Sequence, residues 1–138
     1  MSAWKNVTVL AAALTVLPGC AGGSREVQLS TSPSTPGAEG SILFGVTKND
    51  NTSIDLRVKH LAHPDKLTPP SSAYVVWTKA NKGAAAQNIG TMKVDADLKG
   101  AFVTETPLHS FDLFVTAAAS GQAPMPTGQS LLWTSYSR

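Results

Sequence analysis

The chain has 138 residues, a length that fits one small domain. Charged residues make up 14% of it, below the ~25% usual in soluble domains, and 11 basic against 9 acidic side chains leave a net charge of +2. So small an excess is too weak to indicate a nucleic-acid-binding surface, which normally shows clustered Lys and Arg, and no nucleic-acid partner is predicted. The one cysteine excludes an intrachain disulfide and a metal site built on several cysteines.

An export signal is predicted at the amino end, over residues 1–19. Lys5 precedes an apolar core of 11 residues (7 through 17). A membrane-spanning helix needs ~20 apolar residues to cross the hydrocarbon layer. The core is therefore too short for a span and is typical of a cleaved signal peptide.

The segment Leu17-Pro18-Gly19-Cys20 ends this core and resembles the lipobox of bacterial lipoproteins. The resemblance implies cleavage between Gly19 and Cys20, a diacylglycerol thioether on the Cys20 sulfur, and acylation of the new amine. Such acyl chains hold a protein on a membrane, so the expected partner is the membrane itself. The alternative is an ordinary signal peptide with an incidental cysteine.

The expected location is extracytoplasmic. The residue after the cysteine is Ala21 and not Asp. This resembles the pattern of lipoproteins that are sorted to the outer membrane. In a cell with two membranes the chain is expected on the periplasmic face of the outer membrane, and otherwise on the outer face of the cell membrane.

Residues 20–40 are expected to form a flexible tether. The segment is rich in Gly, Ser, Thr and Pro, and Val27 and Leu29 are its only larger apolar side chains. So little apolar surface does not offset the entropy of ordering the chain. The folded domain is therefore expected over residues 41–138.

Hydrophobic alternation with a period of two dominates residues 41–138 and predicts strands. The cleanest example is residues 52–61, where Ile54, Leu56 and Val58 alternate with charged side chains. Seven strands are predicted, over residues 41–47, 52–61, 73–79, 88–95, 100–105, 110–117 and 129–136. Short strands at this spacing predict an all-β fold, an antiparallel immunoglobulin-like β-sandwich. Trp77 and Trp133 are expected to anchor its core.

Two histidines near the end of the second strand are the candidate metal ligands. His60 and His63 are three residues apart, but a zinc or copper site needs at least a third ligand, and His109 lies far along the chain. His60 also continues the apolar face of its strand, which favours a half-buried position at the edge of the core. No metal or other cofactor is therefore predicted.

No catalytic residue is predicted either. Asp95 and Asp97 form the closest pair of carboxylates, but they flank a glycine-ended turn, where Asp is common for structural reasons. A nucleophile elbow, a P-loop and a dinucleotide-binding motif are absent from the sequence.

A contact loop is expected near the carboxyl end. Residues 117–128 are small or proline-rich, and Pro124, Met125 and Pro126 form their centre. Binding sites of β-sandwiches lie on end loops of this kind, although a plain mobile loop is the alternative. Tyr74, Trp77, Trp133 and Tyr136 are a second candidate, as an aromatic ligand platform, but core packing is favoured for them.

The order of motifs resembles the extracytoplasmic C-terminal domain of the anti-sigma-K factor family. The matching segments are Tyr74-Val75-Val76-Trp77, Asn88-Ile89-Gly90, Asp97-Leu98-Lys99-Gly100, the strand at 111–116, and Pro126-Thr127-Gly128. The resemblance implies an immunoglobulin-like sandwich at the periplasm or cell surface. In that family a sigma-binding domain and a transmembrane helix come first, and here a lipoprotein signal replaces both. Sigma-factor binding is therefore not carried over.

Three functions follow from these observations. The leading hypothesis is a lipid-anchored protein of the cell envelope that binds a protein or cell-wall partner without catalysis. The alternatives are a sensory or regulatory module related to anti-sigma factors, and a lipoprotein that binds a small ligand or metal. No oligomeric state is predicted from the sequence.

Overall fold

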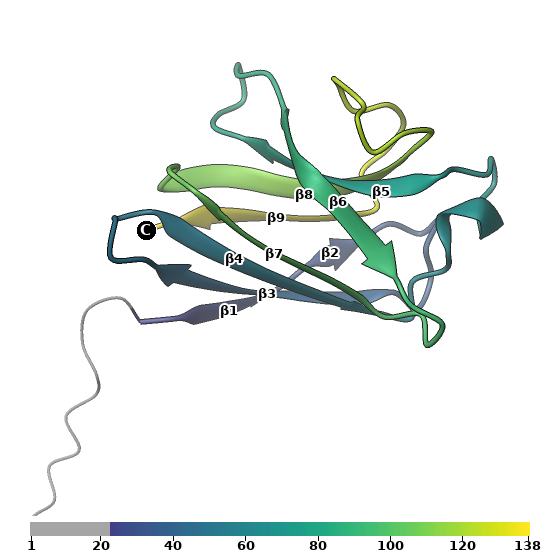
Figure 1. Ribbon diagram of the computed structural model, residues 1–138, viewed down its shortest axis with the longest axis horizontal. Helices are drawn as coiled ribbons and strands as arrows, with labels where there is room; N and C mark the ends of the chain where they lie inside the picture. The colour runs from purple at the N-terminus through teal and green to yellow at the C-terminus, as the bar shows by residue number, and fades with distance from the viewer. Residues whose placement is uncertain (1–22) are drawn as a thin grey trace, which may run out of the picture.

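The computed structural model describes residues 23–138, and the fold is all-β (Figure 1). The predicted signal peptide and Cys20 lie outside the described residues. The strands are β1 (Arg25–Gln28), β2 (Ser30–Thr31), β3 (Glu39–Val46), β4 (Thr52–Lys59), β5 (Ala73–Lys79), β6 (Gln87–Val94), β7 (Gly100–Thr106), β8 (Ser110–Ala118) and β9 (Leu132–Ser137). One 3₁₀ turn, η1 (Pro64–Lys66), interrupts the connection between β4 and β5. Within residues 23–138 there is no helix with the length and apolar character to cross a bilayer.

All strand pairs are antiparallel and form one continuous sheet that curls almost into a barrel. The strand order is β1-β3-β4-β7-β6-β5-β8-β9-β2. β6 joins the two halves, because its last residues pair with β7 and its earlier residues pair with β5. β1 and β2 are consecutive in the chain but lie at opposite ends of the sheet, so the chain at Leu29 brings these two ends together.

Each of the seven predicted ranges overlaps an observed strand, from β3 to β9. The expected total of about seven falls short by two because β1 and β2 lie within the predicted tether. The expectation of a flexible tether is therefore wrong from Arg25 onward. β1 pairs with β3 from Arg25 to Gln28, and the Arg25 guanidinium lies 4.9 Å from the centre of the Tyr136 ring. Backbone pairing and this cation–π contact order a segment with few apolar side chains.

The main core fills the space between the two halves of the sheet. Phe44 stacks on Tyr136 at 4.2 Å between ring centres and meets Phe111 edge-on at 5.9 Å. The alternating residues of β4 lie here as predicted, with Ile54, Leu56 and Val58 fully buried or nearly so. Burial of these side chains is the main stabilising contribution to the fold.

A second, smaller cluster lies on the outer face of β5 and β8. Trp77 is fully buried here, its Nε1–H donates to Thr116 Oγ1 at 2.9 Å, and its ring stacks beside Phe114. Trp133, predicted as a core anchor, lies on the same outer face and is 39% exposed. That expectation is wrong because Leu132, one residue earlier, takes the inward position, and neighbouring residues of a strand face opposite sides.

Candidate functional site

A pocket of about 380 Å³ lies at one end of the domain, between the β4–β5 and β8–β9 connections. Its walls come from four parts of the chain: Ser34, residues 67–71, residues 117–119, and residues 127–129 together with Leu131. Small-molecule sites commonly have volumes of ~300–1,000 Å³. The size therefore suits a small ligand or a side chain of a partner.

The wall formed by the β4–β5 connection is fixed to the core at several points. The side chain of Leu61 is fully buried and its N–H donates to the Leu98 carbonyl. The hydroxyl of Tyr74 donates to the Ala62 carbonyl, and burial raises the pKa of Tyr74 to about 12. The phenol therefore stays protonated, as its donor role requires.

The opposite wall is fixed by side-chain amides. The Asn88 side-chain amide donates to the carbonyls of Gly121 (2.9 Å) and Ala123 (3.1 Å). The Gln129 side chain donates to Ser34 Oγ at 2.7 Å. These bonds tie a long loop to β6 and to the segment after β2, so the pocket has a defined shape.

No charged side chain lines the pocket, within the residues that the structure describes. Leu67, Pro69, Pro70 and Leu131 give it apolar surface, and Ser, Thr and Gln side chains give it neutral hydrogen-bonding groups. A charged ligand would be desolvated here without a counter-charge, at a high cost in free energy. The pocket chemistry therefore favours an uncharged group.

The predicted contact loop lies beside this pocket. Pro124, Met125 and Pro126 directly precede the lining residue Thr127, but none of the three lines the cavity itself. Met125 is 64% exposed and is available to a partner at the rim. The sequence did not predict the walls from residues 67–71 and 117–119, although Pro69-Pro70 marks the first of them as a loop.

The two candidate metal ligands do not form a metal centre with other residues. Across residues 23–138 the structure holds no group of three His, Cys, Asp or Glu side chains arranged to bind a metal ion. His60 has a positive φ of 57° and is exposed, so the expectation of a half-buried histidine continuing the β4 face is wrong. The left-handed backbone ends the alternation at Lys59 and redirects the next side chain.

Asp95 acts as a turn residue, as predicted. Its Oδ1 accepts from the backbone N–H groups of Asp97 (2.9 Å) and Lys99 (3.0 Å). These bonds close the β6–β7 turn, in which Leu98 adopts a positive φ of 59°.

The four residues of the candidate aromatic platform do not lie together. Tyr74 and Tyr136 lie in the main core, while Trp77 and Trp133 lie on the outer face.

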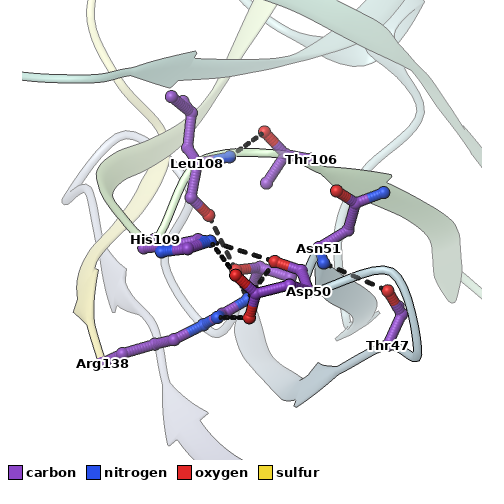
Figure 2. A network of polar contacts seen from close by, with 8 residues as sticks. Thr47, Asp50, Asn51, Thr106, Leu108, His109 and Arg138 are labelled. Atoms are coloured by element: carbon purple, nitrogen blue, oxygen red, sulfur yellow. Dashed lines mark hydrogen bonds and ion pairs between the residues drawn. The ribbon is translucent and has the colours of Figure 1, made fainter.

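A polar network that the sequence did not predict closes the other end of the domain. Figure 2 shows Arg138 and His109 converging on Asp50 in the β3–β4 turn. Arg138 Nη1 donates to Asp50 Oδ1 at 2.7 Å, and His109 Nε2 lies 3.3 Å from Asp50 Oδ2. The Thr52 hydroxyl donates to the Leu108 carbonyl at 2.7 Å. The network joins three segments of the chain that are distant in sequence, so we interpret it as structural.

The network predicts a pH-dependent contribution to stability. The Arg138 guanidinium holds the pKa of Asp50 below its ordinary value. A carboxyl group with a depressed folded pKa contributes stability that is present above its unfolded pKa of about 3.9 and is lost as the pH falls through the folded pKa. We expect Arg138→Met to lower the melting temperature slightly at pH 6 and to have a smaller effect near pH 2, measured by circular dichroism. Asp50→Asn is expected to give the same pH pattern, and an equal loss at both pH values would contradict this account.

Comparison of the chain with family models, curated proteins and solved structures found no match.

Proposed function

We propose that the chain is a lipid-anchored, extracytoplasmic binding protein that acts by contact with a protein or cell-wall partner and does not catalyse a reaction. The observation that carries this proposal is the Leu17-Pro18-Gly19-Cys20 segment, which follows a short apolar core and contains the sole cysteine. The uncharged pocket supports it, because a built cavity without titratable side chains suits recognition better than acid–base chemistry.

The ordered β1 strand brings the proposed anchor close to the domain. Arg25 lies five positions after Cys20, so the intervening chain spans no more than about 18 Å whatever its conformation. Arg25 donates to the Ser137 carbonyl, so the chain enters the domain at the end that holds the Asp50–Arg138 network. We propose that this end faces the membrane.

The pocket then lies at the end away from the membrane. Ala73, at the start of β5, pairs with Ala118, which lines the pocket. Arg25 pairs with Phe44 near the carboxyl end of β3, at the opposite end of the domain. An eight-residue strand such as β3 is roughly 26 Å long. Figure 1 shows the coil of η1 and the β8–β9 connection on the side away from the C-terminus. We propose that this end meets the partner.

We also infer that β3 to β9 form an immunoglobulin-like sandwich. Taken in chain order as strands A to G, they lie in the orders A-B-E-D and C-F-G, which are those of the constant-type immunoglobulin domain. Pairing of β6 with both β5 and β7 joins the two layers here. This order supports the proposed relation to anti-sigma extracytoplasmic domains only at the level of the fold.

The anchor has a direct test at Cys20. We expect the native protein to begin at Cys20 and to carry acyl chains, seen as an increased intact mass, and to sediment with membranes. Cys20→Ala is expected to remove both properties because it removes the sulfur that is alkylated. A wild-type chain that keeps Met1 and a free thiol would contradict the anchor.

The partner has a separate test in intact envelopes. A photo-reactive residue at Met125, beside the pocket, is expected to give cross-linked adducts, whereas the same residue at Lys48, at the other end, is expected to contact only the membrane. Absence of any adduct at Met125 in cells with native amounts of the protein would count against the binding function. The anchor would stand in that case.

A further inference from the structure

One edge of β7 lacks a strand partner over most of its length in the described part of the chain. Gly100 and Ala101 pair with the end of β6, but the residues from Phe102 to Thr106 pair only with β4 on their other side. From Met92 backward, β6 pairs with β5 instead, and Figure 1 shows it crossing away from β7. The edge of β7 is therefore open beyond Ala101.

The hydrogen-bonding pattern tells which backbone groups point to this open edge. In the β6–β7 turn the Asp95 N–H donates to the Lys99 carbonyl and the Asp95 carbonyl accepts from the Leu98 N–H, so Asp95 forms a hydrogen-bonded pair with the Leu98–Lys99 segment. Such pairs alternate along an antiparallel ladder, and the next one is Lys93 with Ala101. Every second residue of β7 therefore directs its N–H and C=O to this edge. Ala101 is already paired with Lys93, so the free groups are those of Val103 and Glu105.

The β3–β4 hairpin gives the same result independently. The Thr47 N–H donates to the Asn51 carbonyl, and the alternation then directs Ile54 of β4 toward β7. Ile54 lies opposite Thr104, so the backbone groups of Thr104 bond to β4 and those of its two neighbours do not. The open edge thus offers two N–H and two C=O groups for a new strand.

The side chains at this edge are unusual for an exposed strand. Val103 is 67% exposed, more than any other large apolar side chain in the described residues. Glu105 is exposed on the same outer face, two residues further on. Natural edges are commonly protected by Lys, Pro or a covering loop, and here an apolar side chain and one carboxylate stand at the edge.

We propose that the open edge of β7 binds an extended segment of a partner protein by β-strand addition. Four backbone hydrogen bonds to Val103 and Glu105 hold the segment antiparallel to β7. Side chains directly opposite each other then pair, so the segment carries an apolar residue opposite Val103 and a basic residue opposite Glu105. Read from its amino end, the segment has the pattern basic residue, any residue, apolar residue.

A second copy of this chain fits the edge less well. An antiparallel self-pair would place Val103 opposite Glu105 of the other copy, with no basic side chain to match either carboxylate. Charge complementarity therefore favours a partner segment with a basic residue. This surface is distinct from the pocket, and its test does not depend on the lipid anchor.

The proposal is tested with a synthetic peptide and the full chain purified in detergent. The probe is the blocked peptide Thr-Lys-Thr-Val-Thr, which places Lys opposite Glu105 and Val opposite Val103. In nitrogen-15 NMR spectra we expect saturable shifts of the Val103 and Glu105 amide signals, with a dissociation constant of about 1 mM. The reversed peptide Thr-Val-Thr-Lys-Thr has the same composition and is expected to bind about tenfold more weakly, because it exchanges the two side chains.

Two proline variants complete the experiment. Val103→Pro removes an N–H that points to the open edge and no bond to β4, so the domain is expected to stay folded and to lose at least tenfold in affinity. The matched control is Glu26→Pro, on the free edge of β1, which is expected to leave the affinity unchanged. No saturable shift up to about 10 mM peptide, equal binding of both peptides, or full binding by a folded Val103→Pro chain would each overturn the proposal.

Discussion

Phe44→Ala is expected to destabilise the domain by about 4 kcal/mol, because it empties the centre of the main core. The Phe44 side chain is 1% exposed, stacks on Tyr136 and meets Phe111 edge-on. The variant loses the transfer free energy of the ring and the two aromatic contacts, and it leaves a cavity that the rigid packing of the core fills poorly. Since small domains are stable by only about 5–15 kcal/mol, the folded population at 37 °C should fall measurably.

Urea denaturation followed by tryptophan fluorescence measures this loss. The matched control is Leu43→Ala at the neighbouring position of β3, where the side chain points outward and is 44% exposed. We expect it to cost less than about 1 kcal/mol. Similar losses for the two variants would mean that β3 does not alternate as described.

Period-two alternation predicts this fold well wherever a strand has one buried face. Ile54, Leu56 and Val58 alternate with polar residues, and β4 follows that pattern from Thr52 to Lys59. The method fails for β1, because a strand at the edge of the sheet needs few apolar side chains of its own. Its order comes from backbone groups offered by β3 and from the contact of Arg25 with Tyr136, and both are distant in sequence.

Alternation also leaves the facing of a strand open when two large residues are adjacent. Leu132 and Trp133 are both apolar, and either could face the core. Pairing of β9 with β8 decides between them, since Leu132 lies opposite the fully buried Val115. Trp133 then lies beside Phe114 on the outer face, as the register requires.

The candidate site was accessible from the sequence only in part. Prolines mark residues 69–70 and 124–126 as loops, and this is a local signal. That these two connections meet at the same end and enclose a cavity follows from the strand order, which no local pattern contains. The open edge of β7 depends in the same way on where β6 changes partners.

A second large effect is expected at Gly90, in the part of β6 that pairs with β5. The register between β5 and β6 shifts between Val76 and Trp77, and Gly90 lies at this bulge with a φ of 143°. A Cβ at Gly90 would lie 2.6 Å from Cε2 and 2.8 Å from Cζ of Phe102, whose ring is rigid. We expect Gly90→Ala to cost about 2–4 kcal/mol, from backbone strain together with the steric clash, as measured by urea denaturation.

Two further variants separate the strain from the clash. Gly37 also has a positive φ, of 84°, but a Cβ there would meet no atom within 4 Å, so Gly37→Ala is expected to cost only the backbone term of about 1–2 kcal/mol. Phe102→Leu in the Gly90→Ala background removes ring atoms from the contact, so the two substitutions should cost less together than the sum of their separate effects. Strict additivity would mean that the ring does not fill the space at Gly90.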